Sequence, residues 1–96
     1  MAGNSFKERF PQHDEAAAQL LAVNVRRLRK TRGLTQDQLA AELDVEQSAV
    51  SLIENARANP ALLLLDAIAR ALNCHMRDLF EESATKASVR ARAKIG

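Results

Sequence analysis

The chain has 96 residues, a formal net charge of +2, a hydrophobic content of 47 % and one Cys. This length supports one domain with a single modest core, and one Cys cannot form an internal disulfide. The N-terminus has no apolar signal-peptide region and the strongly apolar run at 61–65 is too short to span a membrane, so we expect a cytoplasmic protein without membrane contact.

Ala and Leu dominate the sequence, and both residues favour helices. No segment alternates polar and apolar residues with a period of two, and β-branched residues are few. We therefore predict an all-α fold. The chain divides into an N-terminal arm at 1–13, which lacks helical periodicity, a helical domain at 14–82 and a basic C-terminal tail at 83–96.

The first predicted helix runs from about Glu15 to Arg32. Asp14 is its expected N-cap, and Gly33 ends it where a positive φ is needed. The inward stripe consists of apolar residues at helical spacing, namely Leu21, Val25 and Leu28.

Two short helices joined by a tight turn follow. Thr35 and Gln38 form a capping box at the start of a helix that ends near Leu43, and Asp44 is expected in the left-handed region. The next helix covers about Gln47–Glu54. The inward residues of the pair are apolar: Leu39, Ala40 and Leu43, then Val50 and Ile53. Such a pair leaves one polar helix exposed, in the geometry that a DNA major groove accepts.

Asn59 and Pro60 predict the start of a fourth helix, which extends to about Leu72 and stops at Asn73. Its inward residues are expected to be Leu62, Leu65, Ile68, Ala69 and Leu72. A short fifth helix at about Met76–Glu82 is predicted to place Leu79 and Phe80 against the core.

Positive charge is concentrated in two places. One cluster lies on the first helix, at Arg26, Arg27, Arg29, Lys30 and Arg32. The other lies in the tail, at Lys86, Arg90, Arg92 and Lys94. Either cluster alone could be a solvated face, but beside a helix pair of this kind we favour contact with phosphates.

Several segments in order resemble the XRE family of Cro and lambda-type repressors. They are V-R-R-L-R at 25–29, G-L-T-Q at 33–36, Q-L-A-A-E-L at 38–43, V-S-L-I-E at 50–54, N-P-A-L at 59–62, A-I-A-R-A-L at 67–72 and D-L-F at 78–80. The resemblance covers about residues 20–80. It implies a five-helix lambda-repressor-like domain, with the helix-turn-helix at its second and third helices, that binds an inverted repeat as a dimer.

The resemblance also implies roles for individual residues. Base edges are expected to meet Gln47, Ser48 and Leu52. Phosphates are expected to meet Gln36, Ser51 and Asn55, and we add Arg57 in the following loop. Arg29 and Glu54 match a salt bridge between the first and third helices. The chemistry agrees, because Gln can bond adenine through N6 and N7, and Ser can bond several bases. The alternative for Gln47 and Ser48 is that they are ordinary polar residues of a first helical turn.

The chain departs from the family pattern at three places. Glu46 occupies a position where Ser or Thr often caps the third helix, and Ala56 replaces a common Gly. On the fourth helix, apolar residues broaden the surface beyond the inward stripe: Leu63, Leu64, Ala67 and Ala71. A contiguous apolar patch usually marks an interface, so we predict a twofold homodimer contact there. Alternatively, Phe6 and Phe10 of the arm could cover the patch within the same chain.

We therefore expect a sequence-specific regulator that binds double-stranded DNA as a homodimer. It could be a phage-type repressor, a restriction–modification controller or an autoregulating antitoxin. The alternative is a protein-interaction module that kept this fold without binding DNA. An enzyme is not expected: His13, Cys74 and His75 offer no pair of ligands at zinc spacing, and no cofactor, metal or small-molecule ligand is evident.

Overall fold

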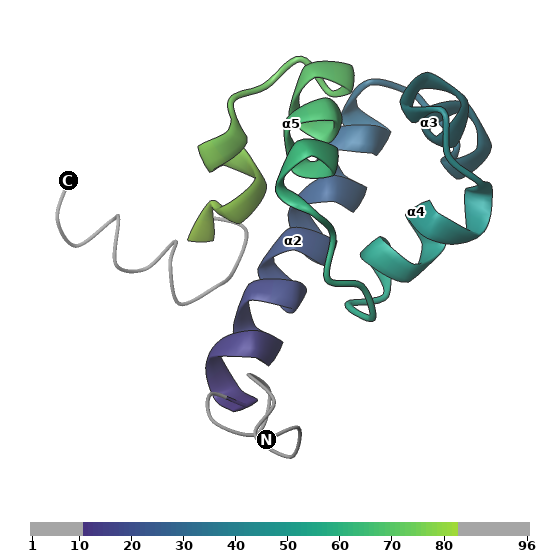
Figure 1. Cartoon of the computed structure of the whole chain (residues 1–96). Coiled ribbons are helices and arrows are strands. Elements are labelled where there is room, and N and C mark those ends of the chain that lie inside the picture. Colours follow the sequence, from purple (N-terminus) through teal and green to yellow (C-terminus); the bar gives the residue numbers. More distant parts are fainter. Residues whose placement is uncertain (1–10, 83–96) are drawn as a thin grey trace, which may run out of the picture.

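A computed structural model describes residues 11–82, with side chains from residue 16 onward (Figure 1). The described part contains four α-helices, one 3₁₀ helix and no strand, which confirms the all-α prediction. The helices are α2 (Pro11–Thr31), α3 (Gln36–Leu43), α4 (Gln47–Glu54) and α5 (Leu62–Ala71), followed by the 3₁₀ helix η1 (Met76–Phe80). The predicted fifth helix begins at Met76 as expected, but it ends at Phe80 and not near Glu82. It is a 3₁₀ helix, with an i→i+3 bond from the Asp78 N–H to the His75 carbonyl.

The long helix α2 begins at Pro11, so the predicted N-cap at Asp14 was wrong. Proline suits the first helical position because its φ is already helical and its missing N–H would have no partner there. At the other end, Gly33 has a φ of 72° and donates its N–H to the Lys30 carbonyl, as the sequence predicted. The rest of the predicted arm, including Phe6 and Phe10, and the tail at 83–96 lie outside the described residues.

One core joins all five elements. α2 packs against α4 and η1, while α3 packs against α4 and α5, as their arrangement in Figure 1 illustrates. Each element contributes one fully buried aliphatic residue, and these are Val25, Leu39, Val50, Ile68 and Leu79. Burying each such side chain is worth about 1.5–3 kcal/mol. The core therefore fixes α4 relative to the rest of the domain.

Local hydrogen bonds specify both ends of α3. The Thr35 hydroxyl accepts from the Gln38 N–H at 3.0 Å, and the Gln38 side chain accepts from the Thr35 N–H at 2.8 Å. This confirms the capping box. Asp44 has a φ of 58°, in the left-handed region as predicted, and the Val45 N–H then donates to the Ala40 carbonyl. The left-handed Asp44 and the bond from Val45 define the turn from α3 into α4.

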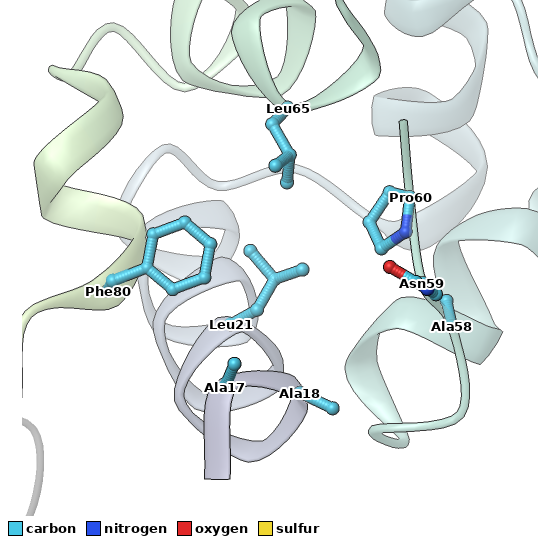
Figure 2. Close-up of a pocket in the computed structure, with 8 residues that line it drawn as sticks. All are labelled: Ala17, Ala18, Leu21, Ala58, Asn59, Pro60, Leu65 and Phe80. Carbon is cyan, nitrogen blue, oxygen red and sulfur yellow. The ribbon is translucent and has the colours of Figure 1, made fainter. Parts of the chain in front are cut away.

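The start of α5 differs from the prediction. The helix begins at Leu62 with Ala61 as its N-cap, so the roles predicted for Asn59 and Pro60 were wrong. Pro60 instead lies in the loop before the helix, where it lines an apolar pocket (Figure 2). The inward assignment of Leu62 was also wrong, since 67 % of its surface is exposed. Leu64, one turn before buried Ile68, packs against the core instead.

A buried amide ties η1 to α2. Asn24 is fully buried, and its Nδ2 donates to the carbonyls of Leu79 at 3.1 Å and Glu81 at 3.0 Å. Its Oδ1 accepts from Arg27 Nη2 at 2.8 Å. Buried polar groups need such partners, and here they position the end of η1 against the long helix.

Candidate nucleic-acid interface

The helix α4 has one buried side and one exposed side. Val50 and Ile53 are buried in the core. On the opposite side Gln47 and Ser48 are exposed in the first turn, and Leu52 is 48 % exposed one turn later. The three residues predicted to meet base edges therefore share the exposed side of a helix whose other side is anchored.

The N-terminus of α4 lacks a side-chain cap. Glu46 is the N-cap residue, it is exposed, and its side chain makes no capping hydrogen bond with the helix. Its carbonyl accepts from the Ala49 N–H at 2.9 Å, as in any helix start. The Glu46 carboxylate thus stands at the end of α4 where a DNA-binding helix would meet the duplex.

A chain of hydrogen bonds runs from the exposed end of α4 into the core. Gln47 Nε2 donates to Gln36 Oε1 at 2.6 Å, and Gln36 Nε2 donates to Glu54 Oε1 at 3.0 Å. Gln36 is half-buried at the first residue of α3, and the side chain of Glu54 is fully buried. The predicted base reader and the predicted phosphate contact therefore touch one another and share an anchor.

That anchor is an ion pair between α2 and α4. Arg29 Nε lies 2.6 Å from Glu54 Oε2, and Arg29 Nη2 donates to Glu54 Oε1 at 3.0 Å. The remaining Nη1 donates to the Leu34 carbonyl at 2.7 Å. A bidentate pair is strong and directional, so it fixes the end of α4 on the long helix. The pair predicted from the sequence is present in this geometry.

The surroundings of Glu54 favour its charged form. Burial raises the pKa of the carboxyl, but the hydrogen bonds from Arg29 and Gln36 and the positive charges of Arg29 and Arg26 outweigh burial, leaving the pKa below its ordinary value. The hydrogen bond to Glu54 raises the pKa of Arg29, with burial opposing it. Both groups are therefore charged at neutral pH.

The remaining predicted phosphate contacts lie at the C-terminal end of α4. Asn55 is exposed, and its Nδ2 donates to the Ser51 carbonyl at 2.8 Å. Arg57 is exposed in the loop, and its backbone N–H donates to the Leu52 carbonyl at 2.9 Å. Between them Ala56 has a φ of 60°, which an L-residue adopts only at a cost. This loop places Asn55 and Arg57 next to the exposed side of α4.

Comparison with known proteins identifies the family. The sequence model of the HTH_3 helix-turn-helix family matches residues 25–79. The chain belongs to this family. The chain is 33 % identical over 60 residues to an uncharacterised HTH-type transcriptional regulator of Archaeoglobus fulgidus. The aligned part covers 62 % of this chain and 86 % of that protein. A similar protein of Methanothermobacter thermautotrophicus is 40 % identical over 57 residues, covering 58 % and 83 %.

Among solved structures, the helix-turn-helix domain is similar to the restriction-modification controller protein C.AhdI of Aeromonas hydrophila. The TM-score is 0.63 at 30 % identity, covering 66 % of this chain and 96 % of that one. The match spans more than the two-helix motif, so it includes the packing that surrounds α4.

The N-terminal part of α5 carries an exposed apolar surface. Leu63 is 80 % exposed beside Leu62, whereas Leu64, Ala67 and Ala71 are half-buried. Leu64 and Ala71 pack against the core, so the four residues predicted as one patch are not equally exposed.

A separate pocket of about 110 Å³ is lined mainly by apolar side chains, as Figure 2 shows. Its lining combines α2, the loop before α5, α5 and η1, through Ala17, Ala18, Leu21, Ala58, Asn59, Pro60, Leu65 and Phe80.

Cys74 and His75 lie in the connection between α5 and η1. Cys74 is half-buried and packs against the core, and burial raises the pKa of its thiol, with Asp78 adding to the effect and Arg27 opposing it. Within residues 11–82 no group of three metal-ligating side chains comes together. In the same part of the chain no helix is long and apolar enough to cross a membrane.

Sequence reasoning missed the contacts of two residues on α2. Asn24 lies between apolar inward residues of α2, and a polar residue at such a position is a signal that could have indicated a buried hydrogen-bonding role. Arg26 was grouped with its neighbours as a phosphate-binding cation, but its Nε lies 3.6 Å from Glu54 Oε1. The sequence alone contains no sign of that second contact.

Proposed function

We propose that this protein is a transcriptional regulator that binds a specific double-stranded DNA sequence as a homodimer on an inverted repeat. The observation that carries the proposal is the hydrogen bond from Gln47 to Gln36, continued to buried Glu54. An exposed amide held in this way is oriented before it meets a partner. The similarity to HTH-type transcriptional regulators of Archaeoglobus fulgidus and Methanothermobacter thermautotrophicus supports a role in transcription.

Gln47 retains the groups that base reading needs. Its amide carries two N–H donors, of which one is directed at Gln36, and its carbonyl oxygen is an acceptor. The second N–H can donate to adenine N7 while the oxygen accepts from adenine N6. Ser48 can bond the next base, and the Leu52 methyl groups can contact a thymine methyl. In this reading Glu46 faces a base amine such as cytosine N4 and avoids the phosphates.

Phosphate contacts on either side would fix the register of α4. We assign them to Gln36 on the first turn of α3, to Ser51 on α4, to its C-cap Asn55 and to Arg57 in the loop that follows. The helix dipole at the start of α3 favours an anion near Gln36. Phosphate contacts orient the protein on the duplex, whereas Gln47 and Ser48 specify the sequence.

A homodimer would supply the second half-site. We propose that exposed Leu63, with its neighbour Leu62, forms the centre of the contact, and that half-buried Leu64, Ala67 and Ala71 form its edge. In a twofold dimer the two copies of α4 would enter successive major grooves about 34 Å apart. Among the three regulator classes expected from the sequence, the likeness to C.AhdI supports a restriction–modification controller.

Selection of bound duplexes from a random DNA pool tests the proposal. We expect enrichment of two half-sites in inverted orientation, with centres about one helical turn apart. Binding should also weaken steeply as salt rises, because phosphate neutralisation releases counterions. A pool without enrichment, together with no salt-dependent binding to random duplex, would contradict the proposal and favour the protein-interaction alternative.

A further inference from the structure

The basic cluster on α2 separates into two groups in the structure. Arg29 points inward to Glu54 and to the Leu34 carbonyl. Arg32 donates to the Ala71 carbonyl and lies 3.4 Å from Glu42 Oε1. These two cations serve contacts between helices. The other three cations border an open groove of about 290 Å³, and they are Arg26, Arg27 and Lys30.

The groove is positively charged overall. Its apolar part is Ala22 and Val23, and its one acidic residue is Glu54, whose two oxygens already accept hydrogen bonds from Arg29. A carboxylate that is buried and paired in this way contributes little negative field to the groove. The groove lining therefore holds three cations and one acid, and that acid is shared between Arg29 and Arg26.

Two of these cations are held in place by neighbouring side chains. Arg26 Nε lies 3.6 Å from Glu54 Oε1, although the Arg26 side chain remains 48 % exposed. Arg27 Nη2 donates to Asn24 Oδ1 at 2.8 Å. A guanidinium that is anchored at one nitrogen and exposed at the others loses less rotamer freedom when it binds an anion.

The groove adjoins the surface that we assign to DNA. Glu54 borders the groove and also ends the hydrogen-bond chain that begins at Gln47. We propose that the groove binds a phosphate of the DNA backbone beside the bases that α4 reads, with Arg26 and Lys30 as the direct ligands. Arginine supplies a planar donor fork and lysine a compact charge, both suited to phosphate. This inference rests on the proposed function.

Salt-dependent binding of the full chain tests the groove. Lys30→Ala and Arg26→Ala should each weaken binding to the selected site and to random duplex by the same factor, and each should lower the slope of log affinity against log salt by about 1. Arg26→Lys should restore most of the slope because it keeps the charge. Arg70→Ala is the matched control, since Arg70 is an exposed cation on α5 that pairs with Asp66. Its slope should equal that of the wild type.

The outcomes separate the groove from the proposed function. If the wild type binds no duplex DNA, the proposed function fails and the groove fails with it. If the wild type binds with a steep slope and neither Lys30→Ala nor Arg26→Ala changes it, the groove is overturned while the function stands. An equal reduction by Arg70→Ala would also overturn the groove, because it would indicate a general effect of net charge. Melting curves of Lys30→Ala identify any loss that comes from unfolding.

Discussion

Gln47 on α4 and Gln36 on α3 are joined by a 2.6 Å hydrogen bond between their side-chain amides. Because Gln36 also donates to buried Glu54, the bond connects an exposed side chain to the core. A side chain held before binding loses less conformational entropy on binding, which is why supported side chains recognise partners better than free ones. The ion pair of Glu54 with Arg29 therefore lies at the buried end of the same chain of hydrogen bonds.

The first prediction concerns the stability that this pair provides. Glu54→Ala leaves Arg29 buried without its partner, and removing one member of a buried pair costs about 3–5 kcal/mol. The matched control is Glu42→Ala, which removes the exposed partner of Arg32 and should cost at most about 1 kcal/mol. Denaturant unfolding of the two variants measures both values. Equal losses of unfolding free energy in the two variants would show that the buried Glu54 pair is no more stabilising than the exposed Glu42 pair.

A second prediction follows from the lowered pKa of Glu54. A depressed carboxyl pKa stabilises the fold above the pKa of the unfolded chain, about 4.3 for Glu, and this stability is lost as pH falls through the folded-state pKa. The difference in unfolding free energy between wild type and Glu54→Gln should therefore shrink as pH is lowered from 7 to about 3. Chemical unfolding at several pH values measures it. A difference that stays constant with pH would mean that the pKa of Glu54 is the same in the folded and the unfolded chain.

Local structure was predictable where one or two neighbouring residues determine it. The capping box of Thr35 and Gln38 and the left-handed positions of Asp44 and Asn73 follow from short-range preferences. The helix-turn-helix pair followed from apolar spacing. The start of α5 did not, because Asn59 and Pro60 are equally good residues for a loop, and in the structure both lie in the loop before Leu62.

The long-range parts of the site could not be predicted from spacing. Asn24 bonds carbonyls 55 and 57 residues away, so its partners are defined only once η1 has packed on α2. The bond between Gln36 and Gln47 likewise depends on the angle between α3 and α4. Residue roles drawn from the family resemblance named Gln36 and Gln47 but not the bond that joins them. Their contacts with DNA remain predictions.

The third prediction concerns the left-handed residue after α4. Ala56 has a φ of 60°, and an L-residue pays about 1–2 kcal/mol there, while glycine loses about 0.4–1 kcal/mol more chain entropy on folding. Ala56→Gly should therefore stabilise the fold by about 0.5–1 kcal/mol. Thermal unfolding checks this. Gly33→Ala is the reverse control: its φ is 72° and an added Cβ meets nothing within 4 Å, so a loss there is conformational. A lower melting temperature for Ala56→Gly would contradict the argument.

The fourth prediction concerns assembly. Because Leu62 and Leu63 are exposed, replacing both with Glu should leave the fold intact and place like charges across a twofold contact. Sedimentation should then show folded monomers, and binding to the selected site should weaken. Leu64→Glu is the contrasting variant, since Leu64 packs against the core and its replacement should destabilise the monomer. A wild-type monomer, or an undiminished dimer of the Leu62→Glu and Leu63→Glu double variant, would remove this surface from the proposed interface.

Sequence reading by Gln47 is the central claim, and binding by Gln47→Ala tests it most directly. The affinity of wild type and variant should be measured on the selected site, on single-base variants of that site and on random duplex at one salt concentration. We expect Gln47→Ala to lose about 1–3 kcal/mol on the selected site, to lose its preference at one base pair, and to bind random duplex as the wild type does. Equal losses on the selected site and on random duplex would contradict a base-reading role for Gln47.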